Sequence, residues 1–369
     1  MLLPPLCFLL AGNEPMWASA PHTPENAEGR EPRGRDIKKT VRNAVISIII
    51  GGAIVWLLLS EIDPRDVPRA IGNVPLLSLL LAFLLYATSV YLKAVRFKII
   101  LRAGISLRQL FPIVSLYMFF ANILPMRTGE LSYVYLLKKQ AKTPGTKSFA
   151  SLIVGGIADF AVILVAMFIV GWHLRDVLAK GFSRFLSALT QKSEAFIQAT
   201  RDNLLLYAIA AVFLIGFITG MVLLKRRKHR VWHYASIMKA KATEVGRELA
   251  DISFDIRLLG IIVCSVLIIS FRFGTQWYLV RSMGITIGIW KLSFALLFGV
   301  LFSLIPIHGP AGFGTVEAPW VAALLLLNIP RKDAITSGFG LHIIIILYCV
   351  ILGLYGALNL RGKTQDSRR

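Results

Sequence analysis

Three carboxylates lie within or beside long apolar stretches of this sequence: Glu130, Asp159 and Glu317. An ionised carboxylate deep in a bilayer costs about 2.5 kcal/mol or more, so such groups usually bind a substrate, carry a proton or pair with a cation. Arg127 could pair with Glu130, neutralise Asp159 or bind a lipid phosphate through two hydrogen bonds. These residues indicate a charged site inside a membrane, although Asp159 could instead make a helix-packing hydrogen bond.

Two of these carboxylates follow runs of helix-breaking residues. Pro125 and Gly129 precede Glu130, and the residues that precede Glu317 are Pro306, Pro310, Gly312 and Gly314. A helix that restarts after each break has free peptide N–H groups and a positive dipole end, both of which favour an anion. Glu130 and Glu317 are therefore either helix caps or parts of a transport site.

Other ionisable groups lie inside apolar stretches. His308 and His342 could relay protons because imidazole titrates near neutral pH, and a structural role is the alternative for each. Arg272 could extend its charge toward the membrane surface or pair with a carboxylate.

The sequence shows no pattern typical of an enzyme or cofactor site. Gly312-x-Gly314 lacks the third glycine and the strand of a dinucleotide fold. His229 and His233 lie within a Lys/Arg run that would repel a metal ion. The three cysteines have no ligand or disulfide spacing; they are Cys7, Cys264 and Cys349. We therefore expect no enzyme activity, cofactor or metal.

Composition predicts a polytopic membrane protein. Of 369 residues, 56% are hydrophobic and only 17% are charged, far from the balance of a soluble domain. The net charge of +21 comes from basic residues between the apolar stretches, which favours contact with anionic lipid over nucleic acid. The densest basic run, expected on the cytoplasmic membrane surface, is Lys225, Arg226, Arg227, Lys228 and Arg230.

Apolar lengths predict an all-α fold with six transmembrane helices and two re-entrant hairpins, because a span needs about 20 residues. The expected spans are 43–60, 76–91, 149–171, 204–224, 258–279 and 337–360. Residues 109–140 and 290–329 each contain two shorter apolar runs around a break, as expected for hairpins. Broken backbone at membrane depth must line protein or a polar cavity.

The distribution of basic residues predicts the topology. Residues 30–42, 93–108 and 361–369 are rich in Lys and Arg, which places both termini in the cytoplasm. Hairpin 109–140 then enters from the cytoplasm and hairpin 290–329 from outside.

An internal repeat supports this arrangement. Arg102-Ala103-Gly104-Ile105 is similar to Arg281-Ser282-Met283-Gly284-Ile285, and each segment leads into a hairpin with a Pro, a Gly and a Glu in the same order. We expect two halves, 37–172 and 203–361, that form an inverted 3+3 repeat, an architecture that recurs in secondary transporters. Chance similarity between apolar stretches is the alternative.

Three further segments complete the expected organisation. Residues 1–36 are expected to be a disordered tail, with a cleaved signal peptide as the alternative. Residues 173–202 carry apolar side chains at helical spacing, which predicts an external interfacial helix. Residues 362–369 form a basic cytoplasmic tail, and 37–361 form the transmembrane domain.

Several of these motifs together resemble the lysylphosphatidylglycerol synthase transmembrane region, a flippase-like membrane family. The motifs are Leu124-Pro125-Met126-Arg127-Thr128-Gly129-Glu130-Leu131 and Pro310-Ala311-Gly312-Phe313-Gly314-Thr315-Val316-Glu317-Ala318. The basic segment 93–102 and Asp159 also stand where that family has such residues, whereas Tyr133 replaces a family arginine. The resemblance implies a polytopic inner-membrane protein that moves or presents lipids, without the family's soluble synthase domain.

The sequence-based expectation is therefore a transporter of a phospholipid or polyprenyl-linked lipid. Its headgroup would contact Arg127, Glu130, Asp159, Gly312, Gly314 and Glu317. One alternative is a non-catalytic membrane subunit that assists a membrane-associated transferase in modifying polyprenyl-linked glycan or lipid. Another is a secondary transporter of small solutes or ions.

Overall fold

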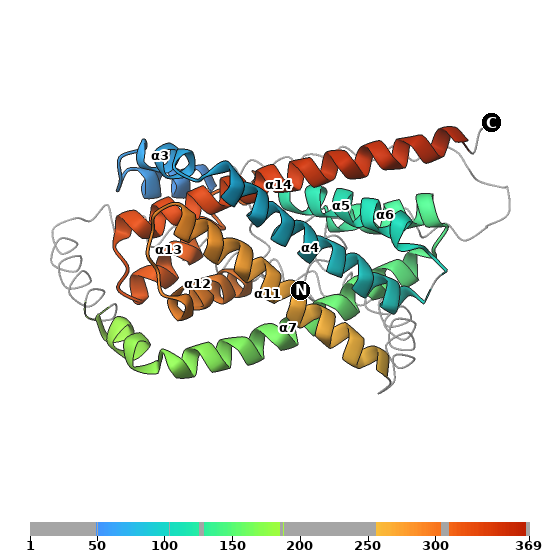
Figure 1. Ribbon diagram of the computed structural model, residues 1–369. Helices are drawn as coiled ribbons and strands as arrows, with labels where there is room; N and C mark the ends of the chain where they lie inside the picture. Colours follow the sequence, from blue (N-terminus) through green and yellow to red (C-terminus); the bar gives the residue numbers. More distant parts are fainter. Residues whose placement is uncertain are drawn as a thin grey trace, which may run out of the picture. The chain divides into compact units, whose positions relative to one another are not determined.

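The computed structural model describes residues 49, 51–102, 104–124, 129–184, 187, 256–303 and 310–366, and in the last range it describes the side chains of 311–360. Within these ranges every regular element is a helix (Figure 1). Residues up to Leu174 and from Glu248 onward form one compact unit, and Arg175–Arg247 form a second.

Four helices are long and apolar enough to cross a bilayer. They are α4 (Leu76–Leu101), α7 (Gly145–His173), α11 (Ile256–Ser282) and α14 (Arg331–Asp366). Their outer faces carry exposed leucine, isoleucine and phenylalanine side chains, as a lipid-facing surface requires. The chain is thus a multi-pass membrane protein, and four of the six predicted spans coincide with helices of the length and composition that a span needs. Of the other two, residues 51–59 are helical, and 204–224 lie outside the described residues.

Two predicted boundaries are wrong. The helix predicted to end at Tyr91 continues to Leu101, so Lys93 and Arg96 lie on α4 and not in a cytoplasmic loop. Arg96 is 1% exposed, which is possible because an acidic side chain neutralises it, as described below. The last helix begins at Arg331, before the predicted start at 337.

Both predicted hairpins have the expected order of helix, break and helix. The first contains α5 (Leu107–Ile123) and α6 (Glu130–Ala141), and the second contains α12 (Ile289–Phe302), the 3-10 turn η2 (Pro310–Gly312) and α13 (Glu317–Leu326). The two helices of each hairpin pack against each other. Their insertion from opposite membrane faces stays a prediction.

The helix contacts repeat when the two halves are exchanged. Helices α4 and α11 run antiparallel, since Ser78 contacts Tyr278 near one end and Ile99 contacts Gly260 near the other (Figure 1). Helix α5 of the first hairpin packs on α14, and α12 of the second hairpin packs on α7. This exchange pattern is what an inverted repeat predicts.

The short helix α3 (Asp66–Gly72) and the residues just before it contact the beginning of α14 through ion pairs. Lys332 Nζ lies 2.9 Å from Asp66 Oδ2, and Arg331 pairs with Glu61. With a cytoplasmic N-terminus before the first predicted span and a cytoplasmic C-terminus after the last, both segments are expected on the outer side, and their contact is consistent with a shared side.

The second unit is described over 175–184 and at 187. Residues 175–184 are helical and Phe182 is 55% exposed, whereas the other apolar positions of the predicted interfacial helix lie outside the described residues. The basic run at 225–230 also lies outside them.

Candidate functional site

The break before α13 has a backbone that suits glycine. Gly312 and Gly314 have φ angles of +77° and +80°, a region that L side chains rarely adopt. A Cβ atom on Gly314 would also lie 2.5 Å from the carbonyl oxygen of Gly51. These glycines let the chain turn into α13 while it packs tightly against the helix around Gly51.

Glu317 is the first residue of α13 and is fully buried. Its Oε2 accepts a hydrogen bond of 2.8 Å from the Gly314 N–H, and its Oε1 lies 2.6 Å from Nδ1 of His342 on α14. The Phe313 ring lies 4.8 Å from the imidazole ring. The side chain therefore fastens the turn that precedes α13, although it does not cap that helix, and it also forms a buried carboxylate–imidazole pair.

A second buried charge pair joins α4 to α7. Arg96 contacts both carboxylate oxygens of Asp159, with Nη2 at 3.1 Å from Oδ2, and its Nη1 donates to Ser265 Oγ on α11 at 2.7 Å. Gly155 leaves the space for this guanidinium, since a Cβ there would lie 3.0 Å from Nη2. Arg96 therefore neutralises Asp159. Arg127, which the sequence suggested for this role, lies outside the described residues.

Two more cations lie near this pair. Lys93 is held over the Tyr117 ring, with Nζ 5.3 Å from its centroid and 3.4 Å from the sulfur of Met118. Lys93 is close enough to Asp159 and Arg272 for their charges to interact with its own. In the described part of the chain neither Lys93 nor Arg272 has a carboxylate within 4 Å. The centre of the α4–α11 pair therefore offers positive groups to an anion.

The structure brings some of the predicted site residues together, and others lie outside the described residues. The structure brings together Glu317 and His342, with Gly312 and Gly314 shaping the turn, and Pro310 begins η2. Glu130 begins α6 and interacts electrostatically with Lys93, while a Cβ on Gly129 would meet the Phe120 carbonyl oxygen at 2.1 Å. The positions outside the described residues are Pro125, Arg127, Pro306 and His308.

Sequence reasoning missed Lys93, Arg96 and Ser265. The signal that could have suggested a buried cation was Gly155-Gly156, one turn before an intramembrane Asp, which leaves room for a large side chain. Tyr133, which departs from the family pattern, is fully buried and stacks 4.5 Å from Phe97, so it belongs to the core.

Comparison with known families gave a match over most of the chain. The family model described as "Lysylphosphatidylglycerol synthase TM region" matches residues 44–353, a range that includes both hairpins and both charge pairs. Comparisons with curated proteins and with solved structures gave no match.

Proposed function

The chain belongs to the lysylphosphatidylglycerol synthase transmembrane-region family, and we propose that it moves a phospholipid or a lipid-linked headgroup across its membrane. The family is described by a phospholipid synthase. The proposal adds that the membrane region itself carries out a transport step.

The observation that carries the proposal is the set of ionic groups inside an apolar helical bundle. Arg96–Asp159 joins α4 to α7, and Glu317–His342 joins the consecutive helices α13 and α14. Side-chain exposure of the four residues ranges from 0% to 15%. Buried ionisable groups of this kind are costly, and in membrane proteins they commonly mark substrate or proton pathways.

Each group has a chemical role in such a step. The cations Lys93 and Arg272 attract the phosphate of a headgroup, and Arg127 remains a proposed phosphate contact. Glu317 and His342 can bind or release a proton as the helices rearrange, which could couple transport to a proton gradient. Arg96 can leave Asp159 and bind the phosphate of an entering headgroup, because a second anion competes with the carboxylate for the guanidinium.

A liposome assay tests the proposal. Purified protein is reconstituted with a fluorescent phospholipid, and the arrival of the label at the outer leaflet is followed with an impermeant quencher. We expect Glu317→Gln and Arg127→Ala to slow movement by about tenfold or more, the equivalent of one lost interaction of about 1.4 kcal/mol. The control Arg69→Ala, on exposed α3, should keep the wild-type rate. If both site variants are folded and move lipid at the wild-type rate, the site takes no part in transport.

The family description favours one second candidate, a membrane subunit that presents lipid to a separate transferase. In this case reconstituted protein alone would move no lipid faster than empty liposomes. A transferase would then co-purify with the full chain from its native membrane, and that complex would modify lipid.

A further inference from the structure

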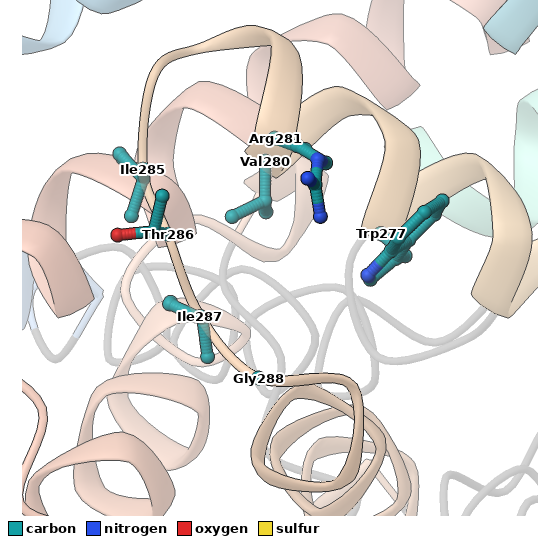
Figure 2. A pocket seen from close by; sticks show the side chains of 7 residues that line it. All are labelled: Trp277, Val280, Arg281, Ile285, Thr286, Ile287 and Gly288. Carbon is teal, nitrogen blue, oxygen red and sulfur yellow. The ribbon is translucent and has the colours of Figure 1, made fainter.

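A cavity of about 210 Å³ lies at the end of α11, apart from the buried charge pairs. Trp277, Val280 and Arg281 form one wall, and the connecting segment 285–288 forms the other. Figure 2 shows the Arg281 side chain between the Trp277 indole and this segment. A cavity of this size is smaller than a pocket for a whole drug-sized molecule, so it suits a headgroup fragment.

The wall is built by a Schellman turn that ends α11. Gly284 has a φ of +79°, its N–H donates to the Arg281 carbonyl, and the Ile285 N–H donates to the Val280 carbonyl. Val280 and Ile285 are both buried and close the apolar side of the turn. With these carbonyls already bonded, the charged group left at the cavity is the guanidinium of Arg281.

Arg281 has no acidic partner in this part of the chain. Residues 256–316 contain no Asp or Glu, and in the described ranges no carboxylate lies within 4 Å of the guanidinium. Arg281 lies 5.6 Å over the Trp277 ring, which fixes the planar group while its N–H donors stay available. The guanidinium is thus held in place for an anion that the chain does not supply.

The surroundings indicate where that anion comes from. Trp277 and Tyr278 lie near the end of α11, and Trp290 lies in the first turn of α12, where its ring stacks 4.3 Å from that of His173 at the end of α7. Tryptophan and tyrosine at the end of a span mark the level of the lipid headgroups. Ile289, 48% exposed beside the cavity, gives acyl chains an apolar surface.

We propose that this cavity binds the phosphate of a bilayer phospholipid with a net negative headgroup. The phosphate oxygens accept hydrogen bonds from Arg281, the headgroup fills the cavity, and the acyl chains lie outside on the apolar helices. Arg281 and Lys291, three residues after Gly288, repel ammonium groups, and among the described residues no carboxylate within 4 Å of Arg281 attracts them. Headgroups without an ammonium group therefore bind best. Binding here is independent of the proposed transport step.

Native mass spectrometry of the full chain in detergent, titrated with phosphatidylglycerol or phosphatidylethanolamine, tests this site. Arg281→Ala should weaken the first phosphatidylglycerol binding step by about tenfold, as expected for loss of charge-assisted hydrogen bonds. Arg257→Ala is the matched control, since it removes an exposed arginine from the other end of the same helix. Equal affinities of these two variants would overturn the proposal.

A second variant keeps the charge and fills the space. Gly288 lines the cavity and has an ordinary backbone conformation, and a Cβ atom added there would have no other atom within 4 Å, so Gly288→Leu adds bulk without strain. Gly288→Leu should also lose the first binding step, whereas Glu317→Gln should keep it. Undiminished binding by Gly288→Leu, or full competition by millimolar inorganic phosphate, would overturn the assignment to a lipid in this cavity.

Discussion

Removal of Asp159 should destabilise the protein strongly, because it leaves Arg96 charged and buried. The Arg96 side chain is 1% exposed, and Ser265 Oγ would be its remaining hydrogen-bond acceptor among the described residues. Breaking a buried ion pair from one side typically costs about 3–5 kcal/mol. We expect Asp159→Leu to lower the free energy of unfolding by about this amount. Arg96→Met should cost less, because Asp159 is 15% exposed and can reach water more easily.

The double variant separates structure from function. Replacement of a whole buried pair by apolar side chains is often neutral. The free energy of unfolding of the double variant Arg96→Met with Asp159→Leu should therefore lie within about 1 kcal/mol of the wild-type value. Denaturant titration in micelles gives the coupling energy, and the liposome assay gives the transport rate. A stable double variant that moves no lipid assigns the pair to transport.

Two results would refute this reasoning. One is an Asp159→Leu variant within about 0.5 kcal/mol of wild type, the range of an ordinary surface substitution. The other is additivity of the two single changes, since contacting residues should couple. The control Glu61→Gln, in an exposed pair with Arg331, should change stability by about 1 kcal/mol or less.

Three shorter predictions follow from close contacts and from topology. Gly155→Ala should be less stable than Gly171→Ala on the same helix by about 1–3 kcal/mol in thermal unfolding. A Cβ on Gly155 meets the Arg96 guanidinium at 3.0 Å, whereas a Cβ on Gly171 meets no neighbouring side chain or helix within 4 Å, so equal stabilities would contradict the packing of Arg96. Gly356→Ala should lose a similar amount against the same control, since its Cβ would lie 2.6 Å from the Pro112 carbonyl oxygen where α14 crosses α5. Cysteines placed at Lys138 and Lys332 should react with an impermeant maleimide from opposite membrane faces, and reaction from one face would remove the inverted arrangement of the two hairpins.

Local features of the sequence determined the class of fold. Apolar length predicted α7, α11 and most of α4 and α14, because a span depends on composition over about 20 consecutive residues. The sequence also predicted that helices end before Glu130 and Glu317, because proline and glycine disfavour a helix at their own positions. Helix ends were less well predicted. Helix α4 continues through a basic segment that was expected to follow the span, because the ion pair with Asp159 offsets much of the cost of burying the Arg96 charge.

The partners of the charged residues depended on the tertiary structure. The sequence identified Asp159, Glu317 and His342 as candidates, but it could not show that Glu317 faces His342 or that Asp159 faces Arg96, 63 residues away. Periodicity defines which face of one helix is apolar, whereas a charge pair depends on which helices pack together and at what height. The packing of α4 against α7 and of α13 against α14 sets both, and this packing turns separate intramembrane charges into pairs.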